Sequence, residues 1–341
     1  MLLRYRPPCD GDRHAELVEP MKPGTALARR RVLLSMAWFG TTVLALPVRG
    51  APAPSDGWPR RFANADGTFT DLPVRPTRIL STSVTITGTL LAIDAPVAAS
   101  ASAANGEFFP QWAETARQRG VENLWPAGGV DLEAVYAVAP DLIVVSATGA
   151  DSAREQLSRL RAVAPTILVD YGRQSWQELA SELAQATGMA AQAARRVAEF
   201  DRYLAQARAK LKLPEGQVNL ISYNGPGTSN PIATREGVHG RLLDTLGFDV
   251  EAPDPRWHST SDAPSDFIWA QYEFLPQLKA STTFLLRADD TRTAAMLNDP
   301  ILANLPSVRS RQVYALGLNA FRIDYYSATE LVDRIVHVFG R

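Results

Sequence analysis

The chain has 341 residues, of which 46% are hydrophobic and 21% are charged, and its 35 basic and 36 acidic residues give a net charge of −1 at pH 7. This composition is that of a folded protein long enough to form two lobes with separate cores, and it excludes a disordered or low-complexity chain. The charge balance argues against nucleic acid as a partner.

Residues 1–53 have the pattern of an export signal. A basic stretch at 29–31 precedes an apolar run over 32–46, and small residues follow at 50–53. Arg29 and Arg30 fit the twin-arginine pattern. We therefore expect a cleaved, twin-arginine-like signal peptide, a periplasmic location and no stable membrane insertion. An uncleaved N-terminal anchor is the alternative, and translation could also begin at Met21.

The only cysteine, Cys9, belongs to this N-terminal segment. The exported protein is therefore expected to contain no disulfide, no zinc–thiolate site and no cysteine nucleophile. A lipid anchor is not expected either, because the cleavage region has no cysteine.

From residue 76 onward, short runs rich in Ile and Val alternate with amphipathic stretches, which is typical of parallel βαβ units. Leu132, Val135 and Tyr136 share one helical face ahead of Pro140, which predicts a helix that ends before a buried strand. The predicted strands are 78–81, 142–146, 166–169, 218–223, 283–286 and 313–316.

One long helix is predicted over Ala190–Lys212, where apolar residues recur at helical spacing without an internal Gly or Pro. A second βα series follows it. We therefore expect an α/β fold with two Rossmann-like lobes, over 54–188 and 214–341, joined by one backbone helix over 189–213.

Enzyme motifs are missing from the chain. His239, His258 and His337 occur in unrelated contexts, and no HExxH, GxSxG, P-loop or GxGxxG pattern is present. We expect a protein that is not an enzyme and that does not bind a metal ion directly. His258 lies in an expected loop and could reach a ligand.

Four segments carry a family resemblance: Arg78–Pro96, Pro140–Gly149, Gln312–Gly317 and Phe321–Ala328. They resemble, in order along the chain, the periplasmic binding proteins for ferric enterobactin and related catecholate siderophores. The resemblance runs from about residue 58 to 339. It implies a class III binding protein with a helical backbone, which is the metal-receptor fold, and a ligand between its lobes.

The same resemblance implies partners. Family members deliver their ligand to the permease subunits of an inner-membrane ABC importer, and one carboxylate on each lobe docks onto permease arginines. Glu133 and Glu273 occupy the matching places. We expect a monomer without a cofactor, in which iron is bound only as the ferric siderophore complex.

Arginines, aromatic rings and hydroxyl groups suit a ferric catecholate, because the complex is aromatic, highly anionic and already saturates its iron. Arg322 is the first candidate, because Phe321 and Tyr325 lie beside it in the strongest motif. Arg235 follows in a polar loop, where the enterobactin binders differ, so the exact catecholate stays open. The remaining ligand-binding candidates are Arg287, Arg78, Ser83, Thr85, Tyr223 and Trp257.

Three alternatives remain open. The ligand could be another chelate, namely a hydroxamate siderophore, haem or cobalamin. The chain could instead be a periplasmic esterase that opens a siderophore, which would require a Ser, a His and an acid within reach of one another. It could also be a signalling partner of an outer-membrane receptor, which would have no need of docking carboxylates.

Overall fold

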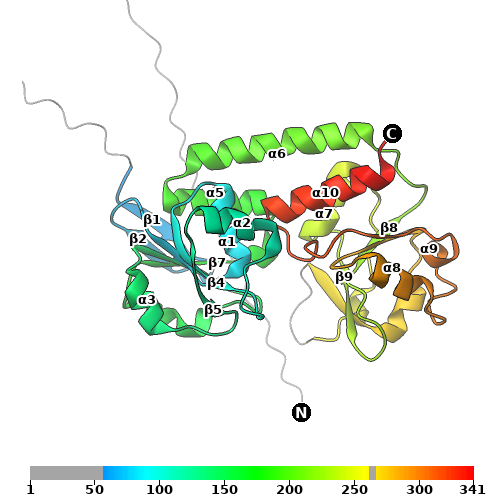
Figure 1. Cartoon of the computed structure of the whole chain (residues 1–341), viewed down its shortest axis with the longest axis horizontal. Coiled ribbons are helices and arrows are strands. Elements are labelled where there is room, and N and C mark those ends of the chain that lie inside the picture. The colour runs from blue at the N-terminus through cyan, green and yellow to red at the C-terminus, as the bar shows by residue number, and fades with distance from the viewer. Residues whose placement is uncertain (1–56, 261–265) are drawn as a thin grey trace, which may run out of the picture. The chain divides into compact units, whose positions relative to one another are not determined.

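The computed structural model describes residues 57–260 and 266–341, which contain two five-stranded sheets and a two-stranded one (Figure 1). The expected α/β fold, with two lobes and one long helix between them, is confirmed. The export signal predicted over 1–53, with its arginine pair, lies outside the described residues.

The first lobe is built on a fully parallel sheet in the order β5-β4-β3-β6-β7. Its strand β6, Leu-Ile-Val-Val-Ser, is buried at every position, as a parallel strand covered on both faces must be. The strands are β3 (Ile79–Ser81), β4 (Val97–Ser102), β5 (Glu122–Pro126), β6 (Leu142–Ser146) and β7 (Thr166–Val169), after a hairpin of β1 (Arg60–Ala63) and β2 (Phe69–Leu72). The helices are α1 (Val84–Ala92), α2 (Pro110–Gln118), α3 (Leu132–Val138), α4 (Leu157–Arg161) and α5 (Trp176–Thr187), with 3-10 turns η1 (Arg154–Gln156) and η2 (Tyr171–Arg173).

The second lobe has a mixed sheet in the order β10-β9-β8-β11-β12. Strands β8, β11 and β12 are parallel to one another, and β9 is antiparallel to both of its neighbours, β8 and β10. Its strands are β8 (Val218–Ile221), β9 (Ser229–Ala233), β10 (Phe267–Gln271), β11 (Thr282–Leu285) and β12 (Val313–Ala315). The helices are α7 (Val238–Leu246), α8 (Asp290–Leu297), α9 (Pro306–Arg309) and α10 (Tyr325–Phe339), with 3-10 turns η3 (Pro255–Trp257) and η4 (Tyr272–Gln277).

The long helix α6 (Ala190–Lys210) joins the lobes and packs against α5 of the first lobe and α7 of the second (Figure 1). The terminal helix α10 returns to pack against α6, α1 and α2, although the sequence assigned it to the second lobe. Phe200 of α6 lies 5.0 Å from Trp176 and 6.1 Å from Tyr325, ring centroid to centroid. One apolar cluster therefore runs through both lobes, and this continuity stiffens their connection.

The predicted strands match β3, β6, β7, β8, β11 and β12 within about two residues, the usual uncertainty of such boundaries. The sequence analysis did not predict β1, β2, β4, β5, β9 and β10. Strand β4 reads Val-Ala-Ala-Ser-Ala-Ser, and after Val97 it has none of the branched and aromatic residues that mark strands. The prediction for Tyr136 was wrong, because its side chain is 62% exposed and Val138 is buried in its place.

Candidate ligand-binding site

A cavity of about 520 Å³ lies between the two lobes. It lies at the carboxyl ends of the parallel strands of both sheets, where ligands bind in open α/β sheets. Thr85 follows β3, Asp151 follows β6 and Arg287 follows β11. The cavity is lined by Val84, Thr85, Ala103, Ala104, Phe109, Pro110, Gln111, Ala127, Ala150, Asp151, Arg287, Leu318, Asn319, Phe321 and Arg322.

Two arginines lie against one aromatic ring on the second-lobe wall. The guanidinium carbon of Arg287 lies 4.9 Å from the centroid of the Phe321 ring, and that of Arg322 lies 5.2 Å from the same centroid. Phe321 stacks in turn on Phe267, with centroids 4.9 Å apart and planes 11° apart. Buried stacking behind Phe321 therefore fixes the ring against which both cations rest.

Arg287 is held in an unusual way. Its φ of 50° is in the left-handed region, where residues other than glycine are uncommon and often serve a site. Burial and the positive charge of Arg322 lower the pKa of Arg287 below its usual value. Within the described residues, no carboxylate forms an ion pair with Arg287 or Arg322. The two cations are thus available to an anionic ligand.

A buried carboxylate organises the first-lobe wall. Ser83 Oγ donates a hydrogen bond to Oδ2 of Asp151 (2.6 Å), and the backbone N–H of Thr85 donates to the same oxygen (3.0 Å). The hydroxyl of Tyr171 donates to Oδ1 (2.8 Å). Burial and the charge of Asp151 raise the pKa of Tyr171, which keeps that hydroxyl protonated as a donor.

The Tyr171 hydroxyl requires a glycine beside it. Gly149 has φ +92°, and a Cβ atom added there would lie 1.8 Å from the hydroxyl oxygen. Tyr171 also reaches across to the second lobe, since the guanidinium carbon of Arg322 lies 5.9 Å from its ring centroid. The Tyr171 ring therefore links the buried carboxylate of one lobe to a cation of the other.

Four of the predicted ligand-binding residues line the cavity, namely Arg322, Arg287, Phe321 and Thr85. Ser83 lies directly behind it, where its side chain caps α1 by accepting from the backbone N–H of Ile86 (3.3 Å).

The structure does not bring Arg78 and Arg235 to the cavity. Arg78 precedes β3, at the amino end of the strand and thus the opposite edge of the sheet, where its Nε donates to the carbonyl of Val138. Arg235 forms ion pairs with Asp249 (3.1 Å) and Asp244 (3.8 Å).

The remaining predicted aromatics also pack elsewhere. The hydroxyl of Tyr223 donates to Asp299 (2.6 Å), and Trp257 stacks on Phe274 with centroids 5.7 Å apart. Tyr325 packs on Trp176, with centroids 5.4 Å apart, at the junction of α10 and α5. His258 is hydrogen-bonded to strand β10, where its Nδ1 accepts from the backbone N–H of Trp269 (3.2 Å), and to its own loop, where its Nε2 contacts the Thr260 hydroxyl (2.6 Å).

The two predicted docking carboxylates are exposed. Glu133 lies in the first turn of α3, which Asp131 caps by accepting from its backbone N–H (2.9 Å). Glu273 lies in η4, directly after β10.

Asp151, Tyr171 and Phe109 are site residues that sequence reasoning missed. Asp151 had a usable signal, because it follows the predicted strand 142–146 on the same sheet edge as Thr85. Phe109 follows β4, which was not predicted, and so had none.

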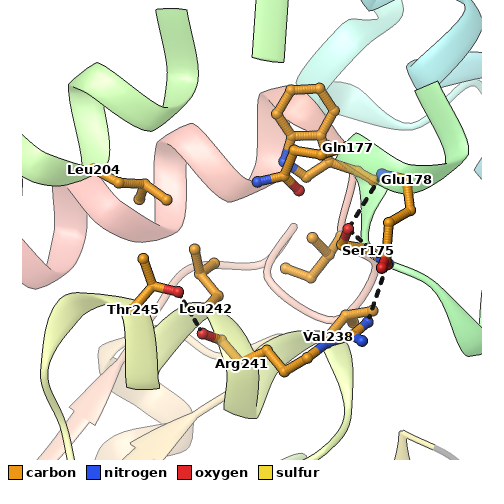
Figure 2. Close-up of a pocket in the computed structure, with 10 residues that line it drawn as sticks. Ser175, Gln177, Glu178, Leu204, Val238, Arg241, Leu242 and Thr245 are labelled. Atoms are coloured by element: carbon orange, nitrogen blue, oxygen red, sulfur yellow. Dashed lines mark hydrogen bonds and ion pairs between the residues drawn. The ribbon is translucent and has the colours of Figure 1, made fainter. Parts of the chain in front are cut away.

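A second, smaller cavity of about 220 Å³ lies where α5, α6 and α7 meet (Figure 2). Leu204, Val238 and Leu242 give it apolar walls. Figure 2 shows Arg241, a cation of this cavity wall, paired with Glu178 (3.7 Å). This cavity lies away from the strand ends and its arginine is already paired, so the larger cavity is the candidate site.

In the described ranges 57–260 and 266–341, no three His, Cys, Asp or Glu side chains gather as a metal site would require. None of the helices in these ranges is long and apolar enough to span a membrane.

Comparison with known proteins identifies the family. A family model described as periplasmic binding protein matches residues 79–320. The ferric enterobactin-binding periplasmic protein FepB of Escherichia coli O6:H1 is 41% identical over 293 residues, which cover 83% of this chain and 91% of FepB. The crystal structure of holo-ViuP matches with a TM-score of 0.82 and 52% identity, over 83% of this chain and 96% of that one.

A more distant structure shares the fold alone. Staphylococcus aureus SirA complexed with staphyloferrin B matches with a TM-score of 0.65 at 16% identity, over 82% of this chain and 97% of SirA. Together with the family model and the identity to FepB, the two-lobed architecture leads to one conclusion: the chain belongs to the periplasmic binding protein family.

Proposed function

We propose that this chain is the periplasmic ligand-binding component of an ABC importer and that it carries a ferric catecholate siderophore of the enterobactin type. The observation that carries the proposal is the position of Arg287 and Arg322, both against the Phe321 ring, in a cavity between the lobes. The identity to a ferric enterobactin-binding protein supports the same class of ligand.

The chemistry of such a ligand fits these groups. A ferric tris-catecholate is a trianion with aromatic faces, and its six catechol oxygens already surround the iron. A binding protein therefore supplies no metal ligand. It supplies guanidinium groups that donate to the catechol oxygens and aromatic faces that contact the rings. In this proposal Arg287 and Arg322 bind the oxygens, Phe321 and Phe109 contact the rings, and Thr85 donates from the first lobe.

We assign no ligand contact to Arg78, Arg235, Tyr223, Trp257 or Tyr325, since each packs or pairs elsewhere. Iron enters and leaves as part of the siderophore complex, without a cofactor and without a chemical change to the ligand.

Delivery completes the proposal. The segment 1–53 directs export to the periplasm, where the protein acts as a monomer. Glu133 and Glu273, one exposed carboxylate on each lobe, dock onto arginines of the inner-membrane permease subunits.

Quenching of tryptophan fluorescence tests the ligand class. Trp112 suits this purpose, because its ring centroid lies 6.3 Å from that of Phe109 in the cavity wall. The protein is titrated in parallel with ferric enterobactin, ferrichrome, haemin and cyanocobalamin. We expect saturable quenching by ferric enterobactin at submicromolar concentration, which corresponds to a binding free energy beyond about −8 kcal/mol.

Two outcomes would overturn the proposal. Quenching by ferrichrome, haemin or cyanocobalamin without a response to ferric enterobactin would assign the cavity to that other chelate. The absence of any saturable response would remove siderophore binding altogether.

A further inference from the structure

Among the described residues, the candidate cavity is lined by one carboxylate, that of Asp151, in addition to the two cations. Asp151 is 6% exposed and lies on the first-lobe wall. Arg287 and Arg322 lie on the second-lobe wall. The charge of the cavity is therefore divided, with a negative group on one side and two positive groups on the other.

Asp151 also occupies the amino end of α1. Its carboxylate accepts from the backbone N–H of Thr85 and from the hydroxyl of Ser83, the residue that caps this helix. Backbone N–H groups at a helix start attract anions. Here the carboxylate of Asp151 already occupies the amino end of α1. The start of this helix therefore presents no free positive group to an anionic ligand.

We propose that Asp151 is a specificity-determining residue that limits the negative charge of the ligands the cavity accepts. The inference rests on the proposed function above, because it concerns discrimination among ferric siderophores at that site. The repulsion between the Asp151 carboxylate and a bound complex grows with the charge of the complex. A trianionic complex is therefore disfavoured more than a monoanionic one of similar shape, and its charge is drawn toward Arg287 and Arg322.

A positioning role must be separated from this charge effect, because Asp151 also holds Tyr171, whose ring contacts Arg322. Asp151→Asn removes the charge and keeps the shape. Its Oδ1 can still accept from Ser83 and Thr85, while its Nδ2 can donate to the Tyr171 hydroxyl, which is able to accept. Tyr171→Phe removes the hydroxyl and keeps the carboxylate.

The test measures dissociation constants of the full chain for two probes at low ionic strength, using tryptophan quenching. One probe is ferric enterobactin, a trianion, and the other is a ferric bis-catecholate, a monoanion. We expect Asp151→Asn to bind the trianion about tenfold more tightly, and the monoanion about twofold more tightly, as for charges separated by several ångströms in a partly buried site. Tyr171→Phe should show no such charge-dependent gain.

The matched control is Glu155→Gln, which removes one negative charge from an exposed position of the same lobe. Solvent and salt screen that charge, so both affinities should stay within about twofold of the unmodified chain. A gain for both probes in Glu155→Gln as large as in Asp151→Asn would reduce the effect to net charge and overturn the inference.

Two further outcomes would also overturn it. If Asp151→Asn changes the affinity for both probes by the same factor, Asp151 is a structural residue only. If Tyr171→Phe loses as much affinity for both probes, the effect arises from the positioning of Arg322. Failure of the unmodified chain to bind either probe would instead refute the proposed function, and the inference with it. Thermal unfolding of each variant identifies any that does not fold.

Discussion

The two lobes have sheets of the same size and present the same edge to the cavity, yet they offer opposite chemistry there. In the first lobe, the carboxylate of Asp151 is satisfied by donors from its own lobe. In the second lobe, Arg287 and Arg322 rest on Phe321 and pair with no carboxylate of the described residues. The comparison indicates that the strands determine where the cavity lies, whereas the residues that follow the strands determine which ligand chemistry it accepts.

The cavity walls of the two lobes differ, but each lobe carries one of the two carboxylates that we propose to dock, and changing these two residues should have the largest effect. Glu133 and Glu273 are both exposed, one on each lobe. Changing both to Gln should abolish uptake of the ferric siderophore, because neither lobe could then form its ion pair with the permease. Uptake of radiolabelled iron by cells measures the effect, and quenching of the purified variant should give an unchanged affinity. Normal uptake would refute the docking assignment.

Charge reversal on the second-lobe wall should give the next largest effect. Arg322→Glu replaces a ligand donor by a repelling carboxylate, and we expect ferric enterobactin affinity to fall at least on the order of 100-fold, about 3 kcal/mol. Arg309→Glu is the matched control, because Arg309 is exposed on α9. Losses of equal size in the two variants, measured by titration, would remove Arg322 from the site.

The sequence predicted the strands rich in Ile and Val, because burial on both faces leaves a continuous apolar run. It did not predict β4, whose Ala and Ser residues carry no strand signal. Of the ligand-binding residues it predicted, Arg322, Arg287, Phe321 and Thr85 line the cavity. Arg235 was misplaced because the ion pairs that hold a loop arginine depend on tertiary contacts, here with Asp249, which local sequence does not reveal.

The lobes meet at Asp324, and this contact predicts a pH dependence of stability. Asp324 caps α10, and Nε2 of Gln111 on α2 donates to its Oδ2 (3.2 Å). A Cβ atom added to Gly88 of α1 would lie 2.5 Å from the same oxygen, so the carboxyl is tightly enclosed. Burial raises the pKa of Asp324 to about 6.

A raised pKa means that the folded protein holds this proton more tightly than the unfolded chain does. The contribution of this proton to the free energy of unfolding is fully present below about pH 4. As the pH rises to about 6 the contribution is lost, and the free energy of unfolding falls by up to about 3 kcal/mol. Asp324→Asn keeps an effective helix cap and should remove this part of the pH dependence. Urea unfolding between pH 4 and 7 measures it, and identical pH profiles for the two proteins would contradict the assignment.

The smallest expected effect separates two arginines within the second lobe. Arg235 is 43% exposed at its side chain and pairs with Asp249 and Asp244. Exposed ion pairs of this kind contribute at most about 1 kcal/mol to stability, and Arg235→Ala should change siderophore affinity by less than about twofold. Arg287→Ala, which removes a cation from the cavity wall, should weaken binding about tenfold in the same titration. If Arg235→Ala instead weakens binding as much as Arg287→Ala does, the loop that carries Arg235 must contact the ligand. The cations of the second lobe that bind the ligand would then include a residue outside the cavity at the ends of the parallel strands.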